Sequence, residues 1–485
     1  MNENLNKALD HISDEKIAEA AGAKKRRSFR WVGAVAAVLA VVLAVSAFFP
    51  AASDSSSPGF VIPANAEGLI AKPEYPEMAP YPDESKYFES NDWEAFDLEY
   101  SAWQEDRMAQ RNQPQGYADT LNSYFHTSIP TLLTGNGDGN SVCSPLNIYM
   151  ALAMLAETTG GSSRQQILNT LGADSIESLR TQAGHVWNAH YMADSASTSV
   201  LANSLWLETG LRYNTDTVQT LADSYYASVF QGDLGTKEMN KLLQDWLNEQ
   251  TGDLLKEQVQ NVNMPEETIL ALASTIYYRA KWTNEFYEEG NTQDIFHAPS
   301  GDKTITYMNT VQMYGPYYWG EDFGAVYLTL EDGSKMWLIL PDEGYSPEDI
   351  LASGHGLELI LGDYSATENQ AGIKVNLSLP KFDVVADLKL NEKLEAMGIT
   401  DVFGAAADFS PILPEDTAYL DTASHAARVK IDEKGVEAAA YTVMMACGAA
   451  RPPEEEIDFV LDRPFLFVIT SHDNLPLFAG IVNEP

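Results

Sequence analysis

Histidine, cysteine and serine are the residues through which this 485-residue sequence could act on a substrate or hold a metal ion. The eight histidines are His11, His126, His185, His190, His297, His355, His425 and His472. None of them pairs at metal-binding spacing on one helix face, and His185 and His190 would point in different directions. The sequence has neither the G-x-S-x-G turn of a hydrolase nor a glycine-rich phosphate loop. We therefore predict that the chain is not an enzyme and holds no metal ion and no cofactor.

Composition excludes further classes of function. The formal net charge of −40 argues against binding to nucleic acid, because such binding depends on lysine and arginine side chains that neutralise phosphates. The two cysteines, Cys143 and Cys447, are too few for a disulfide framework or for a zinc site built from cysteine pairs. Hydrophobic residues make up 45% of the chain, which is enough for a sizeable core.

One stretch near the C-terminus combines residue types that rarely occur together. Residues 431–456 read IDEKGVEAAAYTVMMACGAARPPEEE: an acidic lead-in, a run of small and apolar residues, then two prolines and three glutamates. The run suits a sheet, whereas its flanks are typical of a loop. Taken alone, the run could be an ordinary buried strand or a short helix, since glutamate and alanine favour helices.

The predicted helices and strands that would position the histidine, cysteine and serine side chains are those of an α+β chain. Helical patterns dominate from Tyr117 to Leu171, and SPLNIYMALAMLAETTGG, which starts at Ser144, is the clearest helix. Residues 200–208 and most segments after Thr268 have the composition of strands, joined largely in antiparallel hairpins. This order differs from a repeating β-α-β series.

A membrane segment is predicted near the N-terminus. Four basic residues at 24–27 precede the apolar run WVGAVAAVLAVVLAVSAFF, and a run of this length can cross a bilayer. Because basic residues mark the cytoplasmic side, we expect residues 1–30 to be a cytoplasmic tail and residues 31–50 a transmembrane anchor. The rest of the chain would then lie outside the cytoplasm. The alternative is a signal peptide that is cleaved near Ala47 or Ala52.

Residues 51–112 are expected to form a proline-rich, acidic spacer that includes an amphipathic helix. Four prolines between residues 73 and 82 should keep its first part stiff and extended. Within residues 92–111, Trp93, Phe96, Tyr100 and Trp103 recur at helical spacing. This helix either docks on the main domain, which we favour, or binds a partner.

From Gln113 to Pro485 the sequence resembles the serpin family. The quoted helix and its continuation to Gly172 resemble the family's helix B segment, and LANSLWL and STIYYRAKW resemble strands of its central sheet. LPKFDVVADLKLNEKLEAMGITDVFGAAADFSPI resembles the stretch that joins its sheets A, C and B. DEKGVEAAA resembles the hinge of its reactive-centre loop, and DRPFLFVIT and PLFAGIVNEP resemble its C-terminal strands. The order and spacing of these motifs carry the resemblance.

The resemblance implies the serpin fold for residues 113–485: a helical N-terminal part, three β-sheets with a large central sheet A, and an exposed reactive-centre loop at about residues 433–458. It also implies a mechanism. A serine protease attacks the loop and forms an acyl-enzyme, and the cleaved loop then inserts into sheet A as an extra strand. The attached protease is distorted before it can deacylate. On this interpretation the unusual stretch is a strand that has not yet joined its sheet.

The hinge implied by the resemblance comprises Glu433, Gly435, Val436, Glu437, Ala438, Ala439 and Ala440. Side chains alternate along a strand, so after insertion the even-numbered residues from 436 to 446, which are small or apolar, would face the core. Glu437 and Tyr441 would face solvent, and Gly435 would give the backbone its freedom. Val436 stands where the family usually has threonine or serine. Valine is β-branched and uncharged, so it should not block insertion.

Two further groups of residues are assigned by matching positions of this sequence to those of the family. The shutter, a polar cluster under the middle of sheet A, would comprise Ser144, Asn147, Ser274 and His425, and the breach, where insertion begins, would contain Trp282. Ser144 and His425 match the family's serine and histidine. Asn147 and Ser274 stand where a second serine and an asparagine are usual, so we expect a different hydrogen-bond network.

The family's usual interval from Glu433 places the bond that a protease would cleave at Ala449–Ala450. The neighbouring residues are also small, which suits a protease with a small or shallow primary pocket, such as an elastase-like or a subtilisin-like enzyme. Arg451 would suit a trypsin-like enzyme, but the proline that follows it should resist cleavage.

We therefore predict a monomeric, membrane-anchored extracellular serpin that inhibits serine proteases irreversibly. The anchor, the spacer and the scarcity of cysteine resemble a surface protein of a Gram-positive bacterium. Two alternatives stay open. One is a non-inhibitory serpin that serves as a binding module at the cell surface. The other is a sensor in which cleavage of the loop is signalled across the membrane to residues 1–30.

Overall fold

The structure is a computed structural model that describes residues 68–90, 92–137, 139–257, 259–361, 370–436 and 455–485. Within these ranges, no helix is both long enough and apolar enough to cross a membrane. The expected tail at residues 1–30 and the expected anchor at residues 31–50 lie outside the described residues.

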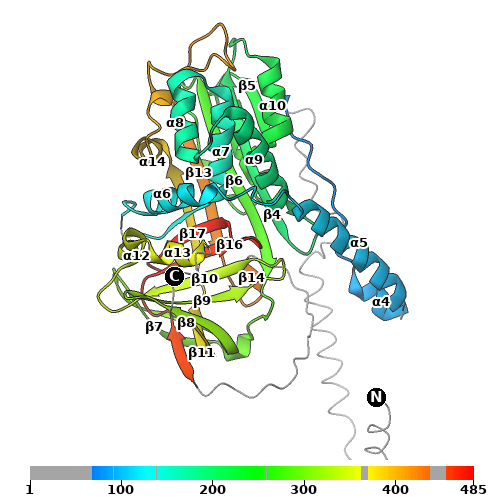
Figure 1. Cartoon of the computed structure of the whole chain (residues 1–485), viewed down its shortest axis with the longest axis vertical. Helices are drawn as coiled ribbons and strands as arrows, with labels where there is room; N and C mark the ends of the chain where they lie inside the picture. The colour runs from blue at the N-terminus through cyan, green and yellow to red at the C-terminus, as the bar shows by residue number, and fades with distance from the viewer. Residues whose placement is uncertain (1–67, 91, 138, 258, 362–369, 437–454) are drawn as a thin grey trace, which may run out of the picture. The chain divides into compact units, whose positions relative to one another are not determined.

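Two β-sheets dominate the described part of the chain (Figure 1). The first, called the central sheet below, has the strand order β1 (Leu69–Ala71), β5 (Ala227–Gly232), β4 (Thr198–Glu208), β6 (Leu270–Lys281), β13 (Thr422–Lys430) and β12 (Asp383–Lys389). Two short strands, β3 (Met192–Ala193) and β14 (Gly435–Val436), pair with β4 and β6 outside this path. β4 and β6 run antiparallel, whereas β6 and β13 run parallel.

The second sheet has the strand order β15 (Glu456–Val460), β11 (Gln370–Pro380), β8 (Gly301–Trp319), β9 (Phe323–Thr329), β10 (Lys335–Pro341), β16 (Phe465–Thr470), β17 (Pro476–Val482) and β2 (Ser141–Cys143), and β7 (Thr292–Ala298) pairs with β8. We expected three sheets, but the described residues form two. The reason is the 19-residue strand β8, which pairs with β7 and β11 along most of its length and with β9 near its end. One strand thus joins what would otherwise be two sheets.

Helices are concentrated in the first half of the chain. They are α4 (Glu84–Ser90), α5 (Trp93–Arg111), α6 (Leu121–Leu133), α7 (Pro145–Thr158), α8 (Gly161–Leu171), α9 (Ile176–His190), α10 (Thr215–Tyr225), α11 (Lys237–Gln250), α12 (Pro347–Ser353), α13 (His355–Ile360) and α14 (Asn391–Ala396). Single 3-10 turns occur at η1 (Val259–Asn261), η2 (Glu288–Gly290) and η4 (Asp401–Phe403). The helix expected from Ser144 onward is α7, and the strand expected at residues 200–208 belongs to β4.

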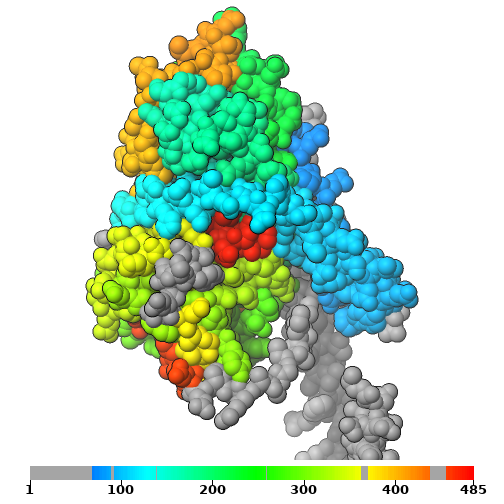
Figure 2. Space-filling view, in the orientation of Figure 1, coloured from blue at the N-terminus to red at the C-terminus, as the bar shows by residue number. Residues whose placement is uncertain are grey.

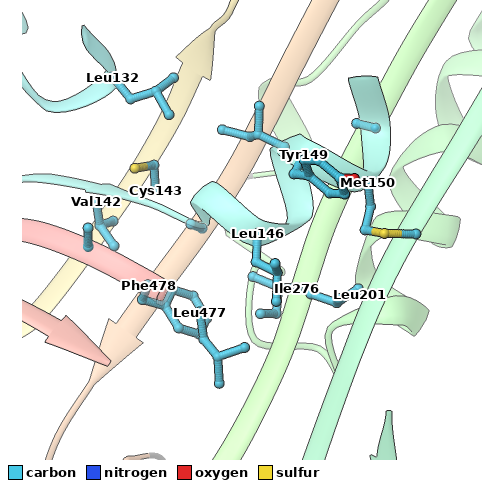
Figure 3. Close-up of a cluster of buried hydrophobic side chains, with 14 of the residues drawn as sticks. Leu132, Val142, Cys143, Leu146, Tyr149, Met150, Leu201, Ile276, Leu477 and Phe478 are labelled. Carbon is cyan, nitrogen blue, oxygen red and sulfur yellow. The ribbon is translucent and has the colours of Figure 1, made fainter. Parts of the chain in front are cut away.

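The helix α7 lies at the centre of the core, and all of its residues are buried. Ser144 caps its N-terminus, and Pro145 occupies the first turn, where a missing backbone N–H costs nothing. Figure 3 shows Leu146 of α7 close to Ile276 of the central sheet, with Phe478 of the second sheet nearby. Because α7 packs between the two sheets, the polar residues at its N-terminus are carried into the interior.

The segment formed by residues 68–112, called the extension below, packs on the rest of the described chain. Its strand β1 pairs antiparallel with β5 at the edge of the central sheet. Its helix α5 falls within residues 92–111, where an amphipathic helix was expected, and Trp103 and Arg107 are its buried residues. Figure 2 shows the extension, in blue, lying against the side of the domain. The described part of the expected spacer is therefore folded onto the domain.

Candidate functional site

The pairing between β6 and β13 covers only part of each strand. Their parallel register joins Thr422–Ala426 of β13 to Ala271–Thr275 of β6. Both strands continue beyond this ladder, β6 to Lys281 and β13 to Lys430. We call the space between these two continuing segments the slot. It offers two strand edges that are not paired with each other.

The strand β14 already lies in the slot, at the end farther from the β6–β13 ladder. Gly435 and Val436 of β14 pair antiparallel with Lys281 and Ala280 of β6. On its other side, Val436 pairs with Ile431, which follows β13. β14 therefore occupies the first two positions of a strand that would lie between β6 and β13.

Residues of the β13 and β6 segments that face a common position differ in residue number by the same amount at both ends of the slot. His425 faces Ser274 in the ladder, and these residues are 151 positions apart. Ile431 and Ala280 both face Val436 and are separated by the same number of positions. A strand that continued β14 through the slot would therefore meet both neighbours in register, and neither neighbour would have to slide along the other.

Gly435 is required where β14 meets β6. A Cβ atom at this position would lie 2.3 Å from the carbonyl oxygen of Ala280 and 2.7 Å from Cα of Lys281. Asp432 prepares the entry, because its Oδ1 accepts hydrogen bonds from the backbone N–H groups of Lys434 (2.8 Å) and Gly435 (3.3 Å). The sequence predicted conformational freedom for Gly435, and the close approach of two strands adds a steric reason for glycine.

Glu433 is 7% exposed and is held by side chains from two distant elements. Lys381 forms an ion pair with it, and Nδ2 of Asn291 donates a hydrogen bond to its Oε1 at 2.5 Å. Burial alone would raise the pKa of Glu433, but the hydrogen bonds from Lys381 and Asn291 bring this pKa below its usual value. The sequence singled out Glu433 but neither partner. The available signal was the LPKF motif, in which Lys381 directly follows β11.

Trp282 fixes the turn that leads into β14. Its indole Nε1 donates a hydrogen bond to the carbonyl oxygen of Asp432 at 2.8 Å. Its backbone N–H donates to the carbonyl oxygen of Lys434 at 2.9 Å. Trp282, assigned above to the breach, therefore lies where β14 enters the slot.

The four residues assigned to the shutter lie together at the end of the β6–β13 ladder, and each is at most 1% exposed. The backbone N–H of Ser144 donates to Nε2 of His425 at 2.9 Å, and the hydroxyl of Ser274 lies 3.0 Å from Nδ1 of the same ring. Because Nε2 accepts a hydrogen bond, the neutral ring carries its proton on Nδ1 and donates it to Ser274. Burial lowers the pKa of His425 to about 3, so the ring is neutral near pH 7.

Asn147, the fourth shutter residue, joins α7 to the central sheet. Its Nδ2 donates to the carbonyl oxygen of Thr275 at 2.8 Å, and Nδ2 of Asn203 donates to its Oδ1 at 3.4 Å. Thr275 is the last residue of β6 in the ladder with β13, so Asn147 binds the backbone at the edge of the slot. Asn203 of β4 was not predicted, because its position in an apolar strand gives no sign of this contact.

Some residues assigned from the sequence lie outside the described residues. They are Glu437, Ala438, Ala439 and Ala440 of the hinge and Ala449 and Ala450 of the predicted cleavage site. In the part of the chain that the structure describes, no cluster of three or more histidine, cysteine or acidic side chains is arranged to hold a metal ion. What the slot offers is backbone pairing along two strand edges rather than reactive side chains.

Comparisons with known proteins agree with this geometry. A family model described as Serpin (serine protease inhibitor) matches residues 123–485. Serpin-Z1C of Triticum aestivum is 28% identical over 369 residues, which cover 71% of this chain and 90% of the relative. The leukocyte elastase inhibitor of Sus scrofa is also 28% identical and covers 72% of this chain and 94% of its own length.

Solved structures share the fold. The thermophilic serpin tengpin in its native state superposes with a TM-score of 0.69 at 25% identity, over 77% of this chain and 95% of tengpin. A native serpin of Arabidopsis superposes with a TM-score of 0.66 at 23% identity, over 77% of this chain and all of that protein. The matched region contains the second sheet, the central sheet apart from β1, α7, the slot and β14. The chain belongs to the serpin family.

Proposed function

We propose that this serpin is an irreversible inhibitor of serine proteases that acts by inserting the loop after β14 into the slot. The main support for this proposal is the position of β14, because Gly435 and Val436 already pair with β6 at the entrance to the slot. The family supports the same proposal, because its model is described as serine protease inhibitor.

The chemistry is supplied by the protease. Its active-site serine attacks the carbonyl carbon of the cleaved bond, the bond to the following nitrogen breaks, and an ester joins protease and serpin. The freed loop then extends β14 through the slot while the ester is intact. Displacement of the protease distorts its active site before water can hydrolyse the ester.

The register of β14 assigns a face to each residue that would follow it. Val436 is 2% exposed and lies opposite Ala280, which is 1% exposed, so its side chain points into the core. Because side chains alternate along a strand, positions 438, 440, 442, 444 and 446 would point the same way. These positions hold alanine, alanine, threonine, methionine and alanine. Insertion of this segment would therefore bury no charge in the core.

The outward positions support insertion as well. Continued by one residue, the register places Glu437 between Arg279 of β6 and Lys430 of β13. Arg279 is half-buried and Lys430 is exposed. An acidic side chain between two basic ones on neighbouring strands favours the paired state.

The driving force of insertion is large. Each new backbone hydrogen bond contributes about 0.5–1.5 kcal/mol net, so roughly ten of them gain a free energy comparable with the whole stability of a typical domain. An inserted strand of about 15 residues spans roughly 50 Å. A protease joined to its end would therefore be carried along the length of the central sheet.

We infer an elastase-like target, with a subtilisin-like protease as the second choice. The small residues at Ala449 and Ala450 fit a small or shallow primary pocket. One relative, from Sus scrofa, is named leukocyte elastase inhibitor, which is consistent with this preference.

We further propose that residues 31–50 anchor the protein in a bacterial cell membrane, with the serpin domain outside the cytoplasm. The support is the order of residues, with basic residues at 24–27 followed by a long apolar run. Cleavage of this segment as a signal peptide would instead release a secreted inhibitor. Sequencing the N-terminus of the mature protein separates the two.

The test is incubation with elastase followed by denaturing gel electrophoresis. We expect a band whose mass is that of elastase joined to the cleaved serpin, because an ester survives denaturation. Elastase whose active-site serine has been blocked should give no such band. Complete cleavage of the serpin with release of active elastase would contradict the inhibitory mechanism and favour a non-inhibitory binding module.

A further inference from the structure

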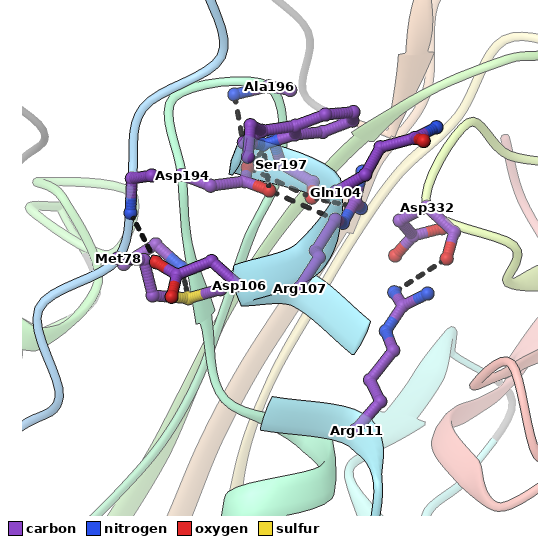
Figure 4. A network of polar contacts seen from close by, with 12 residues as sticks. Met78, Gln104, Asp106, Arg107, Arg111, Asp194, Ala196, Ser197 and Asp332 are labelled. Atoms are coloured by element: carbon purple, nitrogen blue, oxygen red, sulfur yellow. Dashed lines mark hydrogen bonds and ion pairs between the residues drawn. The ribbon is translucent and has the colours of Figure 1, made fainter. Parts of the chain in front are cut away.

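The extension precedes residue 123, where the match to the family model begins. Its helix α5 nevertheless makes buried polar contacts (Figure 4). They lie near the end of the central sheet at which β14 enters, because β4 starts opposite Arg279 and β14 pairs with the next residue, Ala280. The contacts fall into two groups, one to the turn between β3 and β4 and one to the turn between β9 and β10.

The first group joins α5 to the turn between β3 and β4. Asp194 in this turn is fully buried. Nε1 of Trp103 donates a hydrogen bond to its Oδ2 at 2.9 Å, and Arg107 forms an ion pair with the same oxygen at 3.3 Å. Arg107 also donates to the hydroxyl of Ser197 at 3.0 Å. Since a buried carboxylate requires such partners, the turn and the helix are held firmly together.

The second group joins α5 to the turn between β9 and β10. Nη2 of Arg111 donates to the carbonyl oxygen of Asp332 at 2.6 Å. The carboxylate of the same residue accepts a hydrogen bond from the hydroxyl of Tyr278 at 3.0 Å. Tyr278 lies on β6, two positions before Ala280, which pairs with β14. The last turn of α5 is therefore linked through Asp332 to β6 beside the entrance to the slot.

Together these contacts join α5 to two turns that lie near the end of β6. Thr198 at the start of β4 pairs with Arg279 of β6. On the same edge of β6, opposite β14, Trp282 just after β6 forms a bridge with Leu330 just after β9. Because β4 pairs with β6 along ten successive positions, a movement of β6 away from β13 must carry β4 with it. The turn between β9 and β10 belongs to the second sheet, which also contacts β13 through β2, so such a movement shifts the start of β4 relative to that turn.

We propose that α5 is a brace that limits the rate at which β6 separates from β13, and that Arg107 and Arg111 are positioning residues for loop insertion. The proposal depends on the inhibitory function proposed above. Neither arginine contacts a protease in this scheme, and both act through β4 and β6. A change that loosens α5 should open the slot more readily, with faster insertion and a shorter lifetime of the uncleaved state.

The test compares Arg111→Gln, Arg107→Gln and Arg212→Gln in the full chain. Arg212 is the matched control, because its side chain is 68% exposed and pairs with Glu415 on the surface. Amide hydrogen exchange, followed by mass spectrometry on the uncleaved protein, reports separation of the strands without any protease. The loss of one hydrogen bond from a charged donor should raise exchange in β6 and β13 about tenfold. Exchange in the control should equal that of the parent protein.

Three comparisons separate a brace from a general effect on stability. Exchange in α7 and β10 should stay unchanged in Arg111→Gln, and an equal rise in those elements would overturn the proposal. Unchanged exchange in β6 and β13 would overturn it too. Arg111→Lys retains a donor for the carbonyl of Asp332, so it should restore most of the protection. Recovery of most of the exchange protection in Arg111→Lys is expected if Arg111 acts through its hydrogen bond, and is not expected if the substitution only disturbs the packing of α5.

Elastase then tests the link to inhibition. With faster insertion, Arg111→Gln should convert a larger fraction of each cleavage event into covalent complex, whereas Arg212→Gln should match the parent. A parent protein that forms no covalent complex would contradict the proposed function, while the exchange result would still decide whether α5 restrains the sheet. Normal complex formation with unchanged exchange in the variant would contradict the brace and leave the function intact.

Discussion

The hydroxyl of Ser274 and Nδ1 of His425 lie 3.0 Å apart, on opposite sides of the boundary between β6 and β13. The two residues face each other in the parallel ladder. Their hydrogen bond therefore joins the two strands that must separate if the loop is to insert. Both side chains are buried, so the bond stabilises the sheet before insertion and must be replaced afterwards.

The first prediction concerns the pH dependence of stability. Burial lowers the pKa of His425 from 6.5 to about 3. The unfolded state thus binds a proton at higher pH than the folded state, so this contribution to stability is complete above about pH 6.5 and is lost as the pH falls toward 3. His425→Asn keeps a donor for Ser274 but cannot be protonated, so it should flatten this part of the profile. Urea unfolding at a series of pH values measures the effect.

The same variant should lose about 1–3 kcal/mol at neutral pH, because the backbone N–H of Ser144 is left without its acceptor. His297→Asn is the control, since His297 lies on the surface beside Asp302. It should leave the slope between pH 6.5 and 3 in place. An unchanged slope in His425→Asn would show that another group controls acid unfolding.

The second prediction concerns the entrance to the slot. Val436→Arg should turn the inhibitor into a substrate, because insertion would bury an unpaired charge at a cost of several kcal/mol. Before cleavage, Val436 is already buried between Ala280 and Ile431. The variant should therefore also displace β14 before cleavage, while the remainder of the fold persists.

Gel electrophoresis after incubation with elastase measures the outcome as the ratio of covalent complex to cleaved serpin. Val436→Thr is the control and should retain inhibition, because threonine matches valine in shape and is common in the family. If Val436→Arg inhibits as well as the parent protein, position 436 does not enter the sheet.

The third prediction concerns the middle of the slot. Continued from Val436, the register places Thr442 opposite both Ser274 and His425. Its hydroxyl would then take over the hydrogen bond that insertion breaks. Thr442→Val should leave the stability of the uncleaved protein unchanged and destabilise the cleaved, inserted form by about 1–3 kcal/mol.

Thermal unfolding of both forms tests this assignment. Tyr441→Phe, at the neighbouring outward position, is the control and should affect neither form. Equal unfolding temperatures of cleaved Thr442→Val and the cleaved parent would mean that the register shifts during insertion.

The fourth prediction concerns specificity. Ala449→Arg should redirect inhibition from elastase-like to trypsin-like proteases, because the residue before the cleaved bond is read by the primary pocket of the protease. The change leaves the hinge untouched, so covalent complexes with trypsin should form. Mass spectrometry of the released C-terminal peptide should find Ala450 as the new N-terminus in both proteins. Cleavage several residues away would refute the assigned bond without refuting the inhibitor.

Local patterns predicted the elements well, because they depend on residues close in sequence. Ser144 and Pro145 mark the start of α7, and the aromatic spacing from Trp93 to Trp103 marks α5. The shutter residues were reached through the family resemblance, and the fold brings them together. Cys143, which lies just before the apolar helix α7, is buried.

Contacts between distant residues could not be predicted in this way. Lys381 and Asn291 meet Glu433, and Asn203 meets Asn147, only because the sheets bring them together. The extension was expected to be a stiff spacer with a helix that docks on the main domain, but the sequence did not indicate which residues that helix contacts. Its anchors Asp194 and Asp332 lie far along the chain, and nothing near α5 in sequence indicates them.

The position of β14 has a consequence for the kinetics of insertion. Starting a new strand is ordinarily the slow step. A flexible segment loses conformational entropy while it finds its register, and only afterwards do hydrogen bonds offset that loss. Here Gly435 and Val436 form the nucleus before cleavage, and growth from them needs no search. The barrier to propagation is then set by the bonds that hold β6 to β13. The rate of insertion should accordingly rise steeply with temperature and change little when residues are added to the loop beyond the cleaved bond.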